Sequence, residues 1–435
     1  MEPFWLGILG IGTVLVLLAA GVHIAVTLGL VGFVGMALIV GVEPALSILT
    51  TTTFYKVYNV MFLVLILFIL VGVLAATGGI SRDTYHALSL WLNRVRGGLG
   101  MATVASCTAF GTICGSSLVT ASVFARVSAP EMRRYGYDKR LTYGLISAAG
   151  NIGMLIPPSV LIIFYSIIAE ESPGKLLIAG LTPGILLLIV FCLGLWAIGR
   201  IRPALVGSLV PGVTWRQRIV SLRLLWPLTL VATILIVGVS TGVLAVTEAG
   251  GAGVAVVFLF TVITQRSLKP IMPGLAEAAS ISVMIFFIFI SAGVFARFLA
   301  LSGVAPALLK WVVGLGLSHL GMVIVMSVIY IMLGCVLDGI SMIAITVPLI
   351  YPAVQAMGID PIWYGMSIIL AIHIGTITPP VGLNVYAVKG VGEADVSLED
   401  IFIGVVPWFL LSLVALAIII AFPILSTTLP DMMVK

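Results

Sequence analysis

The sequence predicts an all-α polytopic membrane protein, with inverted repeats that each hold a re-entrant helical hairpin and a broken helix. Three observations predict this fold class. The 435 residues are 61% hydrophobic and only 9% charged, with a mean hydropathy of +1.28. Apolar stretches of about 20 residues, the span of a bilayer core, recur along nearly the whole chain. The sequence also matches itself at an offset of about 222 residues, for example Ile152 with Ile374.

This composition excludes several classes of function. A soluble domain carries roughly 25% charged residues, so no part of this chain resembles a separate soluble catalytic domain. Walker loops, nucleophile elbows, HExxH motifs and paired catalytic carboxylates are missing from the sequence. The net charge of +5 is attributed to basic cytoplasmic loops and not to nucleic-acid binding. We therefore expect neither an enzyme nor a cofactor, and no nucleic-acid partner.

The first 58 residues are expected to form N-terminal scaffold helices. The segment Phe4–Ala20 lacks a basic n-region and an A-x-A cleavage site, so we interpret it as a retained span and not a signal peptide. The next loop with few basic residues is Glu43–Tyr58, which we place on the outer side.

The basic residues predict the orientation. They cluster at Arg82–Arg96, Arg133–Arg140, Arg200–Arg223 and Arg266–Lys269. Two further segments, Glu170–Lys175 and the tail after Ser426, are poor in basic residues and are expected to be outer loops. All four clusters fall on the cytoplasmic side if the N-terminus is periplasmic, as the positive-inside rule requires.

Residues 59–200 are interpreted as the first repeat. It holds a scaffold span, a polar arm helix at Arg82–Asn93, hairpin 1 at 100–130, a broken helix at 141–169 and a span at 176–198. Hairpin 1 must leave the cytoplasm and return, because basic loops flank both its ends. Its centre, CTAFGTICGSSLVTAS, is too rich in small residues for two clean spans. Non-helical backbone at this depth is tolerated only where protein or a water-filled cavity surrounds it.

Residues 201–274 are expected to hold a cytoplasmic basic loop and connecting spans, Leu224–Val246 and Gly250–Ile263. Residues 275–428 then form the second repeat. It holds a span at Leu275–Leu301, an arm at Pro306–Leu317, hairpin 2 at 320–357, a broken helix at 362–390 and a final span. Five crossings separate the two hairpins, and because this number is odd the second hairpin enters from the outer side. Such inverted repeats place solute and ion sites near the bilayer midplane.

The clearest internal match is IGMLIPPSV from Ile152, which recurs as IGTITPPVG from Ile374. Two adjacent prolines remove two backbone donors and clash with the preceding turn, so each helix should break at Pro157 and Pro379. A break exposes carbonyl groups and a helix N-terminus, which suit a cation and an anionic group respectively. The alternative is a kink alone.

Polar residues deep in apolar sequence are the candidate site. Cys114–Ser117 (CGSS) offers hydroxyl and carbonyl oxygens for a hard cation such as Na⁺, or else a close helix–helix contact. Asp338 is the counterpart acid, either functional or the cap of a hairpin helix. His373 is either a site residue or a histidine paired with a neighbour. Four more residues could line the cavity or make packing hydrogen bonds: Asn151, Thr376, Thr378 and Asn384. Glu248 is expected at an outer loop as a helix cap.

A series of motifs carries a family resemblance. GGISR, FGTICGSS, APEMRRYGYDK, GNIGMLIPPS, SPGKLLIAGLTPG, TEAGGAG, LDGISMIAITVPLIYP, MGIDPIWYG and TITPPVGLNVY occur in this order. Together they resemble the large membrane subunit (permease, DctM-like) of tripartite ATP-independent periplasmic (TRAP) transporters, over nearly the whole chain.

The resemblance implies an elevator-type carrier, in which a domain with both hairpins slides against a fixed scaffold. It implies a small four-helix membrane subunit and a periplasmic solute-binding protein as partners, in the bacterial inner membrane. It also implies uptake of a small organic anion, usually an organic acid, coupled to Na⁺. A stand-alone carrier without a binding protein is the alternative within transport, and a channel or an intramembrane enzyme is the alternative outside it.

The resemblance also implies which residues bind the ions and the substrate. Tip 1 with the first break would form one ion site, tip 2 with the second break another, and the solute would lie between them. The ion-binding residues would be Cys114, Gly115, Ser116, Ser117, Asn151, Gly153, Pro157, Asp338, Gly339, Ser341, Thr376, Thr378 and Pro379. The substrate-binding residues would be Ser116, Ser159, His373, Thr378 and Asn384. The chain departs from the family pattern at Cys114, usually serine, and at Ala371 and His373, usually Asn and Glu.

Overall fold

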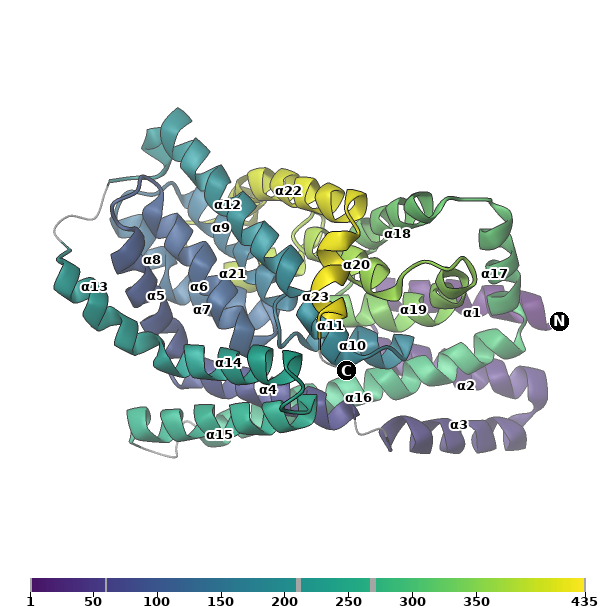
Figure 1. The fold of residues 1–435 in the computed structure, drawn as a ribbon. Coiled ribbons are helices and arrows are strands. Elements are labelled where there is room, and N and C mark those ends of the chain that lie inside the picture. Colours follow the sequence, from purple (N-terminus) through teal and green to yellow (C-terminus); the bar gives the residue numbers. More distant parts are fainter. Residues whose placement is uncertain (1, 59–60, 209–212, 267–270, 434–435) are drawn as a thin grey trace.

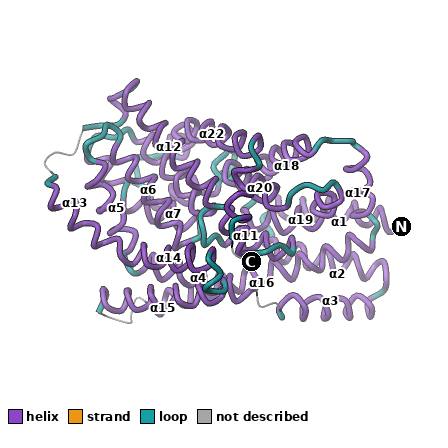
Figure 2. The backbone as a smooth tube through the Cα atoms, in the orientation of Figure 1, coloured by secondary structure: helices purple, strands orange, loops and turns teal. Residues whose placement is uncertain are grey.

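The structure is a computed structural model that describes residues 2–58, 61–208, 213–266 and 271–433. Lys269, part of the fourth predicted basic cluster, lies outside these ranges. Within them the chain is helical, and the one β-type pairing is an isolated bridge between Tyr137 and Val206. Figures 1 and 2 show helices throughout, joined by short loops. The predicted all-α class is confirmed.

Seven helices form what we call the scaffold, along the lower part of the molecule in Figure 1. They are α1 (Pro3–Ala19), α2 (Ile24–Val40), α3 (Val42–Val57), α4 (Met61–Thr77), α14 (Trp226–Ser240), α15 (Val246–Gln265) and α16 (Ile271–Leu301). The long α16 packs against α2, α3 and α4, while α4 also packs against α15.

One expectation for the scaffold was wrong, and one predicted span is shorter than expected. The predicted loop Glu43–Tyr58 is the helix α3, because Gly41, with φ +91°, ends α2 and lets the chain reverse into a new helix at once. The predicted span Leu224–Val246 is present as α14 but ends earlier, at Ser240, and a turn precedes α15. The Glu248 carboxylate accepts a hydrogen bond from the Ala245 N–H at 2.9 Å, so Glu248 caps α15 as expected.

The rest of the chain forms two units, each with an arm helix, a hairpin, a broken helix and a long helix in that order. The first contains α5 (Ile80–Leu92), α6 (Gly98–Cys114), α7 (Ser117–Val127), α8 (Ala129–Arg134), α9 (Lys139–Gly150), the 3₁₀ turn η1 (Asn151–Met154), α10 (Val160–Ala169), α11 (Pro173–Ala179) and α12 (Leu181–Ile201). The second contains α17 (Val304–Gly314), α18 (His319–Gly334), α19 (Gly339–Ala356), α20 (Pro361–Gly375), α21 (Leu383–Val391), α22 (Leu398–Ala421) and α23 (Ile424–Asp431). Between the units lie η2 (Pro203–Leu205), α13 (Trp215–Ser221) and η3 (Leu222–Leu225).

The units approach the centre from opposite ends of the molecule. In Figure 1 the arm helix α5 and the hairpin α6–α7 lie toward one end, and the arm helix α17 and the hairpin α18–α19 toward the other. Two predicted outer loops are shorter than expected. The one at Glu170–Lys175 ends at Ser172, whose side chain caps α11. The tail after Ser426 continues the helix α23, which packs on α11 and α20.

Both predicted helix breaks are present. In the first unit α9 ends at Gly150 and α10 begins at Val160, and in the second α20 ends at Gly375 and α21 begins at Leu383. Proline has no N–H and its ring clashes with the preceding turn, so neither helix continues through its Pro–Pro pair. Both the Pro157–Pro158 and the Pro379–Pro380 peptide bonds are cis.

Glycine pairs bring each hairpin against its broken helix. A Cβ atom on Gly111 of α6 would lie 2.4 Å from the Gly153 Cα. A Cβ atom on Gly334 of α18 would lie 2.7 Å from the Gly375 Cα. The two pairs stand at equivalent places in the units, and each lets backbone touch backbone because neither glycine has a side chain. The first helix of each hairpin therefore packs directly against the broken helix of its own unit.

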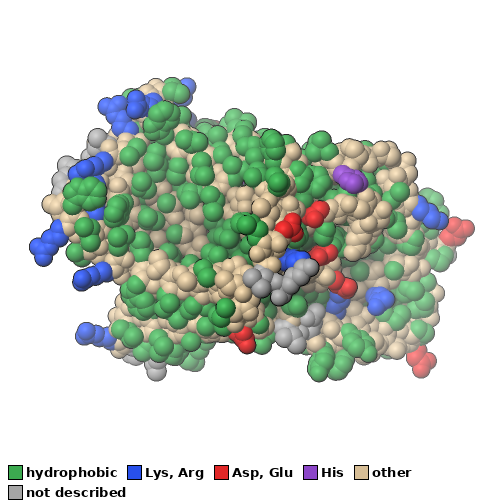
Figure 3. Space-filling model, in the orientation of Figure 1, with side chains coloured by type: hydrophobic (Ala, Val, Ile, Leu, Met, Phe, Trp, Pro, Cys, Tyr) green, Lys and Arg blue, Asp and Glu red, His purple; other side chains and the backbone are tan. Residues whose placement is uncertain are grey.

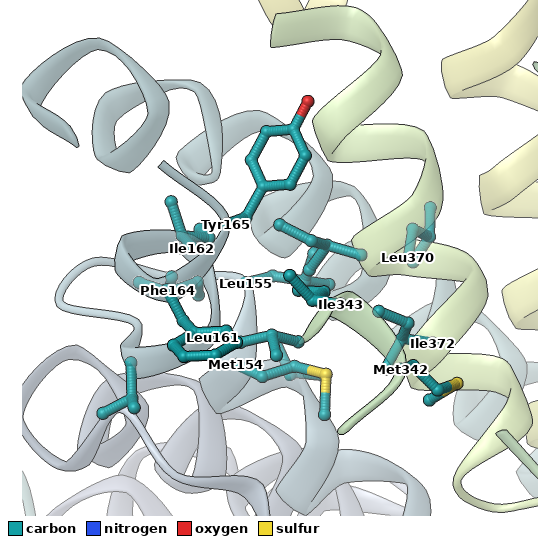
Figure 4. Close-up of a cluster of buried hydrophobic side chains, with 14 of the residues drawn as sticks. Met154, Leu155, Leu161, Ile162, Phe164, Tyr165, Met342, Ile343, Leu370 and Ile372 are labelled. Carbon is teal, nitrogen blue, oxygen red and sulfur yellow. The ribbon is translucent and has the colours of Figure 1, made fainter. Parts of the chain in front are cut away.

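An apolar core joins the two units. Figure 4 shows Leu161 and Ile162 of α10 on one side of Ile343 of α19, with Met342 of α19 and Leu370 of α20 on the other side. These side chains are buried. Burial of this kind holds the second hairpin against the first broken helix, so the two units form one body around their breaks.

The exterior is that of a membrane protein. Within the described ranges, six helices are long and apolar enough to cross a bilayer, or seven if the bent pair α3–α4 is one span. Figure 3 shows an exterior dominated by hydrophobic side chains, with Lys and Arg gathered mainly at the end where α5, α13 and the end of α12 lie.

Candidate functional site

A cavity of about 490 Å³ lies between the two hairpin tips and the two breaks. It is lined by residues of both units and of two scaffold helices. The lining residues are Ile69, Val73, Cys114, Gly115, Ser116, Ser117, Leu118, Val119, Met154, Val160, Leu161, Ile281, Met284, Ile285, Asp338, Gly339, Ile340, Thr376, Leu383 and Asn384.

Tip 1 is the turn between α6 and α7. Gly115 has φ +61°, and a Cβ atom there would lie 2.2 Å from the Pro158 carbonyl oxygen, so only glycine fits. The Gly115 carbonyl in turn accepts a hydrogen bond from the Val160 N–H at 3.4 Å. Ser116 precedes α7, and no side chain caps that helix. Tip 1 is thus tied to the first break, with its hydroxyls and backbone at the cavity wall.

Tip 2 is the turn between α18 and α19. The Asp338 carboxylate accepts hydrogen bonds from the N–H groups of Ile340 (3.1 Å) and Ser341 (3.2 Å), and from the Ser341 hydroxyl. The Cys335 carbonyl accepts a hydrogen bond from the Val381 N–H at 3.1 Å. Tip 2 is therefore tied to the second break as tip 1 is to the first. Asp338 both caps α19 and lines the cavity.

A buried polar network joins the two breaks; we call it the break clamp, and it consists of Asn151, Thr376 and Asn384. The Asn151 side-chain amide donates to the His373 carbonyl oxygen at 2.9 Å and to the Thr376 hydroxyl at 2.8 Å. The Asn384 amide donates to the Asn151 side-chain oxygen and to the Ser147 carbonyl oxygen at 3.4 Å. Each broken helix thus satisfies polar groups of the other, and both Asn side chains are buried.

The predicted site residues fall into two groups. Eight line the cavity: Cys114, Gly115, Ser116, Ser117, Asp338, Gly339, Thr376 and Asn384. Seven more predicted residues stand at the breaks or tips without lining it: Asn151, Gly153, Pro157, Ser159, Ser341, Thr378 and Pro379. The Thr378 hydroxyl donates to the Ile374 carbonyl oxygen at 2.6 Å. Ser159 caps α10, accepting from the Ile162 N–H at 3.1 Å.

His373 does not lie at the cavity. Its Nε2 atom is 3.1 Å from the Ser412 hydroxyl of α22, and its ring is tilted against Phe191 of α12. The side chain is fully buried, and His373 contacts the break clamp only through its backbone carbonyl, which accepts from Asn151. The structure thus gives no support to the predicted contact of His373 with the substrate.

Sequence reasoning missed the apolar wall. Ile69 and Val73 of α4 and Ile281, Met284 and Ile285 of α16 close the scaffold side of the cavity. These residues stand in long apolar helices whose composition is the same on the lipid side and on the protein side. The sequence therefore contains no local signal that separates them from lipid-facing neighbours.

The chemistry available at this site is binding. Hydroxyl, carbonyl and carboxylate oxygens converge at the tips, which is the ligand set that a hard cation prefers. Among the residues that the structure describes, no group of three or more His, Cys, Asp or Glu side chains could hold a metal ion. The arrangement can hold a small solute beside oxygen-coordinated cations.

Comparisons with known proteins identify the family of this chain. The family model of the tripartite ATP-independent periplasmic transporter, DctM component, matches residues 11–425. The C4-dicarboxylate TRAP transporter large permease protein DctM of Pseudomonas aeruginosa is 31% identical over 393 residues, 89% of each chain. The ectoine TRAP transporter large permease protein TeaC of Halomonas elongata is 28% identical, over 97% of this chain and 98% of its own.

A solved structure shows the same fold. The YdaH transporter of Alcanivorax borkumensis superimposes with a TM-score of 0.63 at 15% sequence identity, over 97% of this chain and 98% of that chain.

Proposed function

The chain belongs to the DctM component family of tripartite ATP-independent periplasmic transporters, and from this premise we propose that it imports a small organic anion by Na⁺ symport. It is a multi-pass membrane permease subunit of a transporter and not an enzyme. The single observation that carries the proposal is the cavity between two hairpin tips, each joined by backbone hydrogen bonds to a proline-broken helix.

The coupling ions bind at the two tips. Oxygens of tip 1 (Cys114–Ser117) and of the first break form one Na⁺ site, and oxygens of tip 2 around Asp338 and of the second break form the other. The free carbonyls of an interrupted helix and the hydroxyls beside them are suited to a cation stripped of part of its water. The solute lies between the tips, in contact with Ser116 and Asn384.

Transport follows an elevator mechanism, in which the two units slide as one body against the scaffold. The break clamp and the apolar core of Figure 4 support a single moving body, because they join elements of both units. The scaffold wall of α4 and α16 supports a fixed surface that one side of the cavity passes during the movement.

The partners are a small membrane subunit of four helices and a periplasmic binding protein that delivers the solute. The subunit lies in the bacterial inner membrane with its N-terminus in the periplasm. The gathering of Lys and Arg at the end with α5 and α13 supports this orientation, because basic residues accumulate on the cytoplasmic side.

The experiment is uptake into proteoliposomes that contain the full chain with its small membrane subunit. With the binding protein and a labelled organic acid outside, we expect accumulation driven by an inward Na⁺ gradient and none with K⁺ in its place. Uptake that ignores the Na⁺ gradient would contradict symport. Equal uptake without the binding protein would indicate the stand-alone carrier instead.

A further inference from the structure

We propose that the solute has a single anionic group on an apolar body and that this cavity rejects dicarboxylates. The inference rests on the proposed function, because it takes the cavity as the solute site and the two tips as Na⁺ sites. It goes further by assigning the class of solute from the charges and the surface that the cavity offers.

The first step is the charge of the lining. Of the lining residues that the structure describes, none is Lys, Arg or His, and Asp338 is the one acid. A carboxylate that enters the cavity loses water and must be compensated by opposite charge or by hydrogen-bond donors. The described lining residues supply no positive side chain for this, so the coupling ions are the positive charges that the site offers to the solute.

The second step is the balance of those charges. One Na⁺ at each tip brings two positive charges, and the Asp338 carboxylate neutralises one of them. One positive charge remains, which matches one carboxylate of the solute. A dicarboxylate would leave a negative charge without a partner in a site lined largely by apolar side chains, which is unfavourable.

Asp338 is well placed to keep this role. Its carboxylate accepts hydrogen bonds from two backbone N–H groups and a hydroxyl at the start of α19. These donors fix the acid at the tip, where it faces the cavity. The second hairpin thus presents a negative group to the solute, while no side chain caps the helix that follows tip 1. The single anionic group of the solute belongs near tip 1.

The third step is the apolar wall. Ile281, Met284 and Ile285 of α16 and two residues of α4 line one side of the cavity. Met154 and Leu161 line the side of the first break. A hydrocarbon body gains free energy by leaving water for such a surface, whereas a hydroxylated body would lose hydrogen bonds there. Methionine adapts its shape, so Met284 suits bodies of different length.

The test uses matched pairs of acids that differ only in the second carboxylate: pentanoate with glutarate, and hexanoate with adipate. The full chain, purified with its small subunit, is titrated with each acid in NaCl, and its melting temperature is measured. We expect each monocarboxylate to reach half of its stabilising effect at a concentration at least about tenfold below that of its dicarboxylate, because of the unpaired buried charge.

Each outcome decides the inference. Stabilisation by a dicarboxylate at an equal or lower concentration would overturn it, as would the absence of any effect of the monocarboxylates. The same titration in KCl separates it from the proposed function. If the preference for monocarboxylates is identical in KCl, both Na⁺ coupling and the charge balance drawn from it are refuted. If the transport assay shows Na⁺-driven uptake of a dicarboxylate, only the present inference is refuted.

A substitution in the wall provides the second readout. Met284→Gln should weaken the effect of hexanoate about tenfold and that of pentanoate less, because the longer chain reaches further along the apolar wall. Met272→Gln is the matched control, since Met272 stands on the same helix, is 67% exposed and does not line the cavity. Equal behaviour of the two variants would remove Met284 from the solute site.

Discussion

At the level of single residues, Asp338 illustrates how one side chain serves structure and function together. It caps α19 and lines the cavity, so the loss of its charge and the loss of its cap need to be separated. Asparagine caps a helix about as well as aspartate, so Asp338→Asn retains the cap and removes only the charge.

We expect Asp338→Asn to abolish Na⁺-driven uptake in proteoliposomes while the melting temperature stays within a few degrees of the parent protein. Asp360→Asn is the matched control, because Asp360 caps α20 through the N–H groups of Ile362 and Trp363 and lies outside the cavity. It should transport normally. Full uptake by Asp338→Asn would remove this acid from the ion site.

Ser116 tests the other tip in the same way. Ser116→Ala removes a hydroxyl from the cavity wall at a position where no side chain caps α7. We therefore expect loss of Na⁺-driven uptake with little change in stability, measured by the same transport assay and by thermal unfolding. Normal Na⁺ dependence in this variant would argue against an ion site at tip 1.

The break clamp joins the two broken helices through a few buried side chains. Asn384→Ala leaves the Asn151 side-chain oxygen without its donor in a buried site, which should lower the free energy of unfolding by about 1–3 kcal/mol. Asn151→Ala should cost a similar amount. Because the two side chains contact each other, the double variant should cost less than the sum of the single variants. Strictly additive losses in a double-mutant cycle would show that the two breaks are not coupled through this contact.

Among the elements, the closest contacts are those of each hairpin with its broken helix. We expect Gly111→Ala and Gly334→Ala each to lower stability by about 1–3 kcal/mol, because the added Cβ atom meets backbone that has no room to give way. The temperature of thermal unfolding and the rate of uptake should both fall. Gly251→Ala is the control, since a Cβ atom there meets nothing within 4 Å. An unchanged Gly111→Ala variant would mean that hairpin 1 is not seated on the first break in the membrane.

For the whole molecule, the gathering of basic residues predicts which end faces the cytoplasm. In a background with Cys192 and Cys335 replaced by Ser, Glu43→Cys should react with a membrane-impermeant maleimide on spheroplasts. Arg82→Cys should react only after lysis, because Arg82 stands in the arm helix α5 at the basic end. Labelling of Arg82→Cys before lysis would reverse the proposed orientation.

The local features of this fold could be predicted from the amino-acid sequence alone. Paired prolines remove backbone donors wherever they occur, so both breaks could be located from IPPS and TPPV alone. Small and polar residues between two basic loops predicted hairpin 1, and the match at an offset of about 222 residues predicted its counterpart. The tip residues that line the cavity followed from these motifs.

Which surfaces meet could not be predicted from the sequence, because it depends on the packing of segments that are far apart in the chain. The apolar wall of α4 and α16, the contact between Asn151 and Asn384, and the direction of His373 toward Ser412 all depend on how distant segments pack. In a membrane protein, lipid-facing and protein-facing side chains are equally apolar, so composition does not tell them apart. The helix α3 was missed for a related reason, because few charges and a mixture of polar residues suit an exposed loop and a packed helix alike.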